Sequence, residues 1–255
     1  MGLLEQMQAV DRLVRRPGAL AAALGAADPA DREVLETIDP RRLAAVSGSH
    51  ARQVLGRWWL PRFPATLAAL GGDPAVDATA RELVASDRFE RAVEEDLTGA
   101  VLVHGLLDAL EGGRLADAAP WTRELLAYEY LLAVGLPRRA AREPLDPEVE
   151  ARLLGPAVAS HAGGRLRLPV LAVSGWEWPV AAIREGVSPD EAEEAPEAVL
   201  FLIEPDGAVE AEAPASAVAA IALLARGAAD PEVSQSLGVG WKPLRRWLRE
   251  LRLIA

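Results

Sequence analysis

The chain has 255 residues, of which 51% are hydrophobic and 25% charged, and its formal net charge is −11. This is the composition of a folded globular protein, because intrinsic disorder needs lower hydropathy and more charge. The sequence contains no cysteine, which excludes disulfides, thiolate metal sites and thiol nucleophiles.

No apolar run of about 18 residues occurs without an interrupting charge or glycine, so the sequence predicts no membrane span. The first residues, Met1–Glu5, lack the basic start and apolar core of a secretory signal, so we expect a cytoplasmic protein. The three histidines lie far apart without metal-ligand spacing, and we expect no metal and no cofactor. The negative net charge disfavours a nucleic-acid partner.

The first half of the chain has the periodicity of helices, with apolar residues recurring every three or four positions up to about residue 140. Asp28-Pro29, Asp39-Pro40 and Asp73-Pro74 each combine a helix N-cap with proline at the first helical position. Helices are therefore predicted to begin at these pairs. Together the helical segments predict an all-helical bundle over residues 1–142.

Two longer helices are predicted within this bundle. One carries Trp58 and Trp59 on one side and is predicted to kink or stop at Pro61 and Pro64. The other runs from Arg88 to Glu111 and has a continuous apolar stripe. His104 lies on that stripe, and we interpret it as a hydrogen-bonded core histidine.

The second half of the chain has a different character. Residues 137–147 are charged, rich in proline and aperiodic, which indicates a linker or a long surface connection. Leu168–Val173 and Ala198–Ile203 are short apolar runs typical of strands, and the turn Pro205-Asp206-Gly207 predicts a β-hairpin. The acidic stretch Glu185–Glu197 is interpreted as a solvated loop.

The end of the chain is helical again. Helices are predicted from Asp230 to Leu237 and from Trp241 to Leu253, with the spacing of a helix-turn-helix. The basic residues of the last helix are Lys242, Arg245, Arg246, Arg249 and Arg252. The predicted fold class is therefore α+β, with an N-terminal all-helical bundle over residues 1–142. A small winged-helix-like module with a short β-sheet follows over residues 143–255.

No specific catalytic signature is present, neither a phosphate-binding glycine loop nor a nucleophile elbow nor a zinc-binding helix motif. The acidic residues Glu94, Glu95 and Asp96 are adjacent in the sequence, and neighbouring helical residues point about 100° apart. Only one of the three could face an inward site, so they are poor candidates for paired acid–base catalysis. We therefore expect no catalytic residue, and an unrecognised enzyme stays an open alternative.

Several stretches resemble one family of partner proteins. These stretches are His50–Leu55, Pro61–Thr66, Phe89–Asp96, Leu125–Tyr130, Val199–Ile203 and Leu248–Ile254. Their order over most of the chain is similar to that in the partner subunits of multinuclear non-heme iron-dependent oxidative enzymes. Those enzymes modify ribosomally made precursor peptides, and the nearest resemblance is to the partner proteins of 3-thiaglutamate and methanobactin biosynthesis.

The resemblance implies a non-catalytic subunit of a heterodimer. In such pairs the iron enzyme is a TIM barrel on a separate chain, and it oxidises a cysteine of the precursor peptide. The partner binds the enzyme through its helical part and presents the leader of the peptide through the winged-helix-like module. A DNA-binding regulator with a helix-turn-helix remains the alternative.

Two groups of residues are candidate contacts for these partners. A sheet edge in either predicted strand could accept the leader as an added strand, and the basic helix would suit an acidic leader. The candidate peptide-binding residues are Val170, Leu171, Val199, Leu200, Phe201, Leu202, Arg245, Arg246 and Arg249. Because Trp and Arg are enriched at protein interfaces, the helical half should supply the docking surface for the enzyme. Its candidate residues are Arg57, Trp58, Trp59, Arg62 and Phe63.

Overall fold

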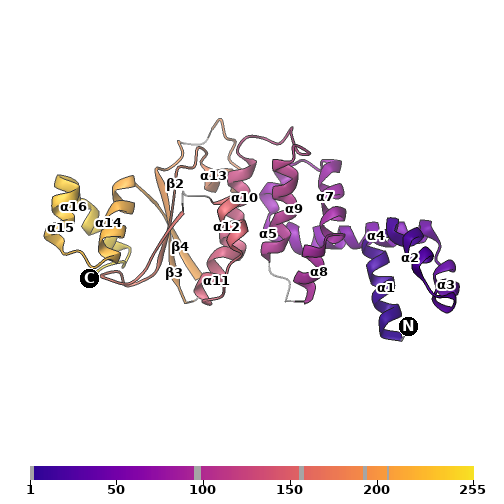
Figure 1. Cartoon of the computed structure of the whole chain (residues 1–255). Coiled ribbons are helices and arrows are strands. Elements are labelled where there is room, and N and C mark those ends of the chain that lie inside the picture. Colours follow the sequence, from indigo (N-terminus) through magenta and orange to yellow (C-terminus); the bar gives the residue numbers. More distant parts are fainter. Residues whose placement is uncertain (1–2, 95–98, 155–157, 192–193, 206) are drawn as a thin grey trace. The chain divides into compact units, whose positions relative to one another are not determined.

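The structure is a computed structural model that describes residues 3–94, 99–154, 158–191, 194–205 and 207–255 (Figure 1). The chain divides into two compact units, Met1–Ala119 and Pro120–Ala255. The predicted boundary after residue 142 thus falls inside the second unit. The helices on either side of that position belong with the sheet that follows them.

The N-terminal unit consists of helices and turns in its described residues. Its α-helices are α1 (Leu3–Arg15), α2 (Leu20–Ala26), α3 (Pro29–Glu36), α4 (Pro40–Val54), α5 (Leu60–Arg62), α6 (Pro64–Ala69), α7 (Pro74–Val84), α8 (Asp87–Glu94) and α9 (Gly99–Glu111). A short 3-10 helix, η1 (Pro17–Ala19), precedes α2, and a π-helical turn, η2 (Leu55–Trp59), joins α4 to α5.

Three of these helices begin at Asp-Pro pairs, as predicted. The carboxylates of Asp28, Asp39 and Asp73 each accept a backbone N–H from the first turn of α3, α4 and α7, at 2.8–2.9 Å. The proline that follows occupies a position whose N–H would have no helical partner. Each cap of this kind stabilises its helix by about 1 kcal/mol.

The helix that carries the two adjacent tryptophans does not end at Pro61. Instead α4, η2 and α5 follow one another directly, and the Leu60 N–H bonds to the carbonyl of Leu55 five residues earlier. A proline lacks an N–H and its ring crowds the preceding turn, and the wider π turn accommodates both effects. The predicted kink or stop at Pro61 is therefore replaced by a π turn, whereas the predicted stop at Pro64 is confirmed, because α5 ends at Arg62.

Trp59 belongs to the core of the N-terminal unit. Its side chain is fully buried, and its indole N–H donates a 2.8 Å hydrogen bond to the carbonyl of Leu102 on α9. The next turn of α9 carries Gly105, where a Cβ would lie 3.2 Å from the Trp59 ring and 3.3 Å from Leu83. Glycine at this position lets α9 approach η2 and α7 closely.

The strongest predicted helix, Arg88–Glu111, is present as α8 and α9. Residues 95–98 between them lie outside the described residues, and so do Glu95 and Asp96 of the acidic triplet. His104 on α9 is 1% exposed, which confirms its predicted place in the core.

The C-terminal unit combines helices with a sheet, which confirms the α+β class. Its α-helices are α10 (Thr122–Tyr130), α11 (Leu136–Ala140), α12 (Pro147–Leu153), α13 (Val180–Arg184), α14 (Ala215–Ala225), α15 (Asp230–Leu237) and α16 (Trp241–Glu250). A π turn, η3 (Leu131–Gly135), joins α10 to α11, and a 3-10 turn, η5 (Gly238–Gly240), joins α15 to α16. The strands are β1 (Val158–His161), β2 (Val170–Ser174), β3 (Ala198–Glu204) and β4 (Gly207–Ala213).

The four strands form an antiparallel sheet in the order β1-β2-β3-β4. The predicted hairpin is present, since Glu204 at the end of β3 pairs with Gly207 at the start of β4. Farther from the turn, Val199 pairs with Glu212. In this order β1 and β4 are the edges of the sheet, and β2 and β3 lie inside it.

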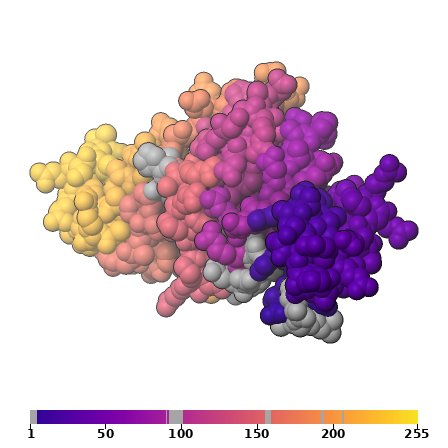
Figure 2. Space-filling model, turned by 45° about the vertical axis from the view of Figure 1, so that its right-hand side comes forward, coloured from indigo at the N-terminus to yellow at the C-terminus, as the bar shows by residue number. Residues whose placement is uncertain are grey.

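Helices of the same unit cover both faces of the sheet (Figure 1). On one face Leu200 packs in a cluster with Ile221 of α14 and Leu248 of α16; α14–α16 form the yellow group in Figure 2. On the other face the ring centroid of Phe201 lies 6.3 Å from that of Tyr128 on α10. Burial on both faces explains why β2 and β3 are continuous apolar runs rather than alternating ones.

The two C-terminal helices occupy their predicted places, although the last one ends at Glu250 rather than Leu253. Asp230 at the start of α15 forms two ion pairs, with Arg165 at 2.6 Å and with Arg245 of α16 at 2.5 Å. One carboxylate therefore joins α15, α16 and the turn that precedes β2.

That turn passes very close to the end of α14. The Arg165 N–H donates a 2.9 Å hydrogen bond to the carbonyl of Leu224. Gly164 has a φ of +57°, and a Cβ there would lie only 2.3 Å from the carbonyl oxygen of Ala225. Both the left-handed backbone and the close approach require glycine.

Candidate functional site

The strands that were predicted to offer a free edge both lie inside the sheet. β2 pairs with β1 and β3, and β3 pairs with β2 and β4. The six candidate peptide-binding residues on these strands are at most 3% exposed: Val170, Leu171, Val199, Leu200, Phe201 and Leu202. An extended peptide cannot pair with them while the sheet is intact, so the predicted edge is wrong.

The longer of the two edge strands is β4, with seven residues against four in β1. In a two-residue hairpin the residues that flank the loop exchange hydrogen bonds, so Gly207 turns its backbone groups toward β3. Successive residues of a strand direct their backbone groups to opposite sides in the plane of the sheet. The N–H and C=O groups of Ala208, Glu210 and Glu212 therefore point away from β3. Within the described residues, no backbone group is bonded to these outward groups.

A cavity of about 280 Å³ lies beside one end of β4. Its walls come from the segment between β2 and α13, from the first turn of α13, from Glu191 and Glu194 before β3, and from one residue each of β3 and β4. The side chains that define its chemistry are Trp176, Trp178, Glu191, Glu194, Val199 and Glu212. No basic residue is among the described residues that line it, so the cavity joins two indoles with uncompensated carboxylates.

The aromatic wall of this cavity is held in place from α10. Both carboxylate oxygens of Glu124 accept backbone N–H groups, from Glu177 at 3.0 Å and from Trp178 at 3.1 Å. The ring of Trp176 stands edge-on to that of Tyr128, with centroids 5.8 Å apart. The tryptophan wall is thus fixed by α10 rather than by a ligand.

Tyr128 also reaches β4. Its hydroxyl donates a 2.6 Å hydrogen bond to the carboxylate of Glu210. Burial raises the pKa of Glu210, and the hydrogen bond from Tyr128 opposes part of that rise. Burial, together with the hydrogen bond to Glu210, raises the pKa of Tyr128 far above its ordinary value, so the proton stays on the phenol.

The basic residues predicted to assist peptide binding do not join this site. α16 packs through Leu248 against the sheet face opposite α10. Arg245 is engaged with Asp230, and the Nε of Arg249 donates a 2.8 Å hydrogen bond to the carbonyl of Ala255. Arg246 is exposed.

The predicted enzyme-docking residues are divided between core and surface. Trp59 and Phe63 are both 0% exposed, so their assignment as docking residues is wrong. Arg57 is exposed and Trp58 is half-buried. The guanidinium carbon of Arg62 lies 5.1 Å from the centroid of the Trp58 ring. Arg57, Trp58 and Arg62 therefore form the part of this group that a partner could reach.

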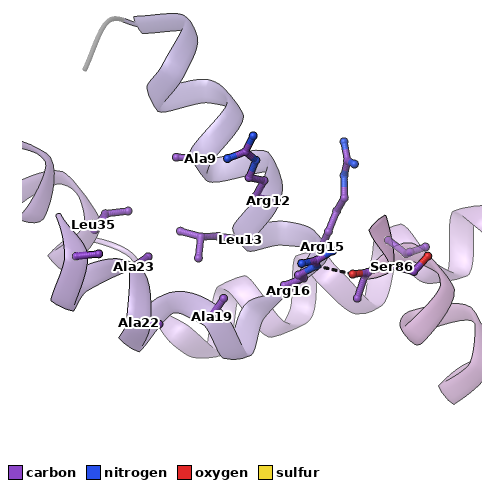
Figure 3. Close-up of a pocket in the computed structure, with 13 residues that line it drawn as sticks. Ala9, Arg12, Leu13, Arg15, Arg16, Ala19, Ala22, Ala23, Leu35 and Ser86 are labelled. Carbon is purple, nitrogen blue, oxygen red and sulfur yellow. Dashed lines mark hydrogen bonds between the residues drawn. The ribbon is translucent and has the colours of Figure 1, made fainter. Parts of the chain in front are cut away.

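The N-terminal unit has a larger cavity, of about 560 Å³, between α1, α2, α3 and the end of α7. Alanines cover much of its wall, and Arg12, Arg15 and Arg16 lie at its rim (Figure 3). Arg15 pairs with Asp11 and Arg16 with Asp87, and the three arginine side chains do not converge on one point (Figure 3). This cavity lacks the few convergent polar groups that orient a ligand.

Other kinds of site are not found in the part of the chain that the structure describes. No group of three or more His, Asp or Glu side chains there could hold a metal ion. None of the described helices has both the length and the apolar character needed to cross a membrane. The outward edge of β4 and the cavity beside it are therefore the candidate functional site.

The sequence interpretation did not identify this site. The cavity residues Glu191 and Glu194 were assigned to a solvated loop, and they are indeed exposed. The available signal was the motif Trp176-Glu177-Trp178-Pro179 close to that acidic stretch. Only the order of the strands shows that Glu212 joins these residues.

No protein-family model matches the chain, and neither a curated protein nor a solved structure matches it. What the chain does must therefore follow from its own residues, above all from β4 and its neighbouring cavity.

Proposed function

We propose that the chain is a non-catalytic partner subunit that binds the leader of a precursor peptide along β4. In this proposal it also docks on a separate iron-dependent TIM-barrel enzyme in the cytoplasm, which oxidises a cysteine of the peptide. The C-terminal unit serves as the winged-helix-like recognition module, with α14–α16 as its helices and the β3–β4 hairpin as its wing.

The observation that carries the proposal is the outward edge of β4. An exposed edge offers a row of N–H and C=O groups with which an extended peptide can pair. The backbone groups of Ala208, Glu210 and Glu212 supply this row. Helices cover both faces of the sheet, so peptide addition at the edge leaves the core undisturbed.

The enzyme-docking part of the proposal rests on the accessible turn around η2. Arg57 is exposed, Leu60 is 53% exposed, and Arg62 stacks over Trp58. Partly exposed tryptophan and arginine are the side chains that dominate binding energy at protein interfaces. We assign the iron-dependent enzyme to this surface.

The alternative, a DNA-binding regulator, would use α15 and α16. Asp230 lies between Arg165 and Arg245, so one of the two central arginines of α16 already has an anionic partner. A DNA-binding helix normally directs its basic residues at phosphates and bases. The structure thus favours the peptide proposal over the regulator.

The test starts from the genes beside the one that encodes this chain. We expect an iron-dependent TIM-barrel enzyme and a short cysteine-containing peptide, and the fluorescently labelled leader of that peptide is the probe. In the full chain, Ala208→Pro removes one outward N–H from β4 without touching the β3–β4 hydrogen bonds. Ala208→Thr is the matched control, because it keeps the N–H and suits a strand.

Leader binding is expected to weaken by about tenfold in Ala208→Pro and to stay unchanged in Ala208→Thr. Thermal unfolding of both variants confirms that the fold is kept. Equal leader binding by a folded Ala208→Pro variant would overturn strand addition. Binding of duplex DNA with a steep salt dependence would instead support the regulator.

A further inference from the structure

We infer that the cavity beside Glu212 accepts a lysine or arginine side chain of the bound peptide, and so selects a basic residue at one position of its ligand. The inference rests on the proposed peptide binding along β4. It reverses the expectation of an acidic leader, because the charge at this edge of the sheet is negative.

The chemistry of the walls favours a cation. Indole rings such as those of Trp176 and Trp178 attract an ammonium or guanidinium group. The carboxylates of Glu191, Glu194 and Glu212 add a net negative charge. Among the described residues none of these three glutamates has an ion pair. A cation that enters the cavity would therefore find unneutralised carboxylates rather than compete for paired ones.

The size of the cavity suits one side chain. Its volume of about 280 Å³ is just below the range of about 300–1,000 Å³ that is usual for whole small-molecule ligands. The aliphatic stem of lysine or arginine would lie against Val199 and the indoles, and the charged end would reach the carboxylates.

Strand geometry directs a peptide side chain into this cavity. Residues that face each other across two strands project their side chains to the same face of the sheet. Glu212 and its partner Val199 both line the cavity, so that face is the cavity face. A peptide residue opposite Glu212, on the outer side of β4, would place its side chain on the same face.

The site is also organised before any ligand arrives. The Glu124 carboxylate fixes the backbone at Trp178, and Tyr128 supports Trp176. A rigid wall lowers the ordering cost of binding. The glutamates on the edge also discourage pairing with uncharged strands, which would restrict β4 to ligands of complementary charge.

The experiment uses the immobilised full chain to select from a random-peptide display library. We expect enriched peptides to carry lysine or arginine at one fixed position within an alternating, β-prone segment. The enriched peptide is then synthesised with its basic residue kept or replaced by norleucine, and both are titrated against the protein by fluorescence anisotropy.

Glu212→Gln is expected to lower the affinity for the lysine peptide by about tenfold and to leave the affinity for the norleucine peptide unchanged. Glu204→Gln is the matched control, because Glu204 is an exposed glutamate of the same sheet that does not line the cavity. It should change neither affinity. The Glu212 effect should shrink as salt rises.

The two proposals fail in different ways. Suppose that Ala208→Pro weakens peptide binding but that replacement of the basic residue by norleucine does not change the affinity. This result would overturn the cavity assignment and leave strand addition standing. Lysine peptides that respond to Glu212→Gln but not to Ala208→Pro would overturn strand addition and leave the cavity assignment standing. Selection of no peptide at all would overturn both.

Discussion

The hydroxyl of Tyr128 on α10 donates a 2.6 Å hydrogen bond to the carboxylate of Glu210 on β4, which ties a helix to the edge strand of the sheet. Tyr128→Phe removes the donor and leaves a half-buried carboxylate without it. We expect a loss of about 1 kcal/mol in the free energy of unfolding at neutral pH, measured by thermal or chemical unfolding.

The same substitution has a defined pH dependence. Burial already raises the pKa of Glu210 above its ordinary value of 4.5, and loss of the Tyr128 bond raises it further. A carboxyl whose pKa is raised in the folded state contributes stability that is complete below its ordinary pKa and is lost as pH rises. Tyr128→Phe should therefore cost more at neutral pH than near pH 4.5.

Tyr130→Phe is the matched control on the same helix. The Tyr130 hydroxyl is buried and has no hydrogen-bond partner among the described residues. Its removal should be neutral or slightly stabilising, because no bond is lost. Equal destabilisation by the two substitutions would show that the Tyr128–Glu210 bond contributes nothing specific.

His161 on β1 should contribute to acid sensitivity. Burial, together with the charge of Arg226, lowers its pKa below the ordinary 6.5. The unfolded chain then binds the proton more readily, so this contribution to stability is present above pH 6.5 and is lost as pH falls toward the folded-state pKa. The unfolding temperature of His161→Gln should fall less than that of the parent between neutral pH and about pH 5. Identical pH profiles for the parent and His161→Gln would rule out His161 as the source.

Gly164 and Gly163 give a sharp test of the close approach to α14. Both have positive φ, but a Cβ at Gly163 meets nothing within 4 Å, whereas one at Gly164 would lie 2.3 Å from a carbonyl oxygen. Gly163→Ala should cost about 1 kcal/mol for the backbone strain alone. Gly164→Ala should cost about 3 kcal/mol, because the backbone must also move apart. Chemical unfolding of the two variants measures the difference.

The neighbouring tryptophans of η2 should behave in opposite ways. Trp59→Ala opens a cavity in the core and should lower the free energy of unfolding by about 3–5 kcal/mol. Trp58→Ala should cost less than about 1 kcal/mol and should weaken binding to the proposed iron-dependent enzyme in size-exclusion or titration experiments. Unchanged enzyme binding by Trp58→Ala would remove η2 from the docking surface.

The local features of the fold could be predicted from the sequence. The helix starts at Asp28, Asp39 and Asp73 depend on side chains within a few residues of the bond they make. The turn between β3 and β4 and the pair of helices α15 and α16 are similarly local. Such features need no knowledge of distant partners, and the sequence patterns for them were correct.

The domain boundary could not be predicted from composition. The proline-rich, charged stretch 137–147 was interpreted as a linker or a long surface connection, but residues 137–140 belong to α11 and Pro147 begins α12. Asp146 accepts the N–H of Glu148 at 2.9 Å and is followed by proline, which is the same helix start seen three times earlier in the chain. The Asp-Pro signal for a helix start was therefore present in the sequence. The charged, proline-rich composition of the stretch led to its interpretation as a linker or surface connection instead.

The position of the candidate site depends on strand order, which is a long-range property. The strand Val158–His161 is short and was not predicted, and without it β2 would have had a free edge. The cavity likewise joins residues 176–199 with Glu212 only after β4 has paired with β3. Sequence patterns within one segment do not contain this information.

The π turn η2 also determines which of the residues after Val54 face the core. The buried positions along α4, η2, α5 and the residue that follows are Leu43, Ser47, Ala51, Val54, Trp59 and Phe63. The step from Val54 to Trp59 is five residues, whereas successive buried positions of an α-helix are three or four residues apart. In an uninterrupted α-helix, Trp58 would continue the buried stripe. The extra residue therefore decides which of two adjacent indoles becomes core and which becomes surface. Deletion of Gly56 would place Trp59 four residues after Val54, so a regular α-helix would keep Trp59 in the core without the π turn.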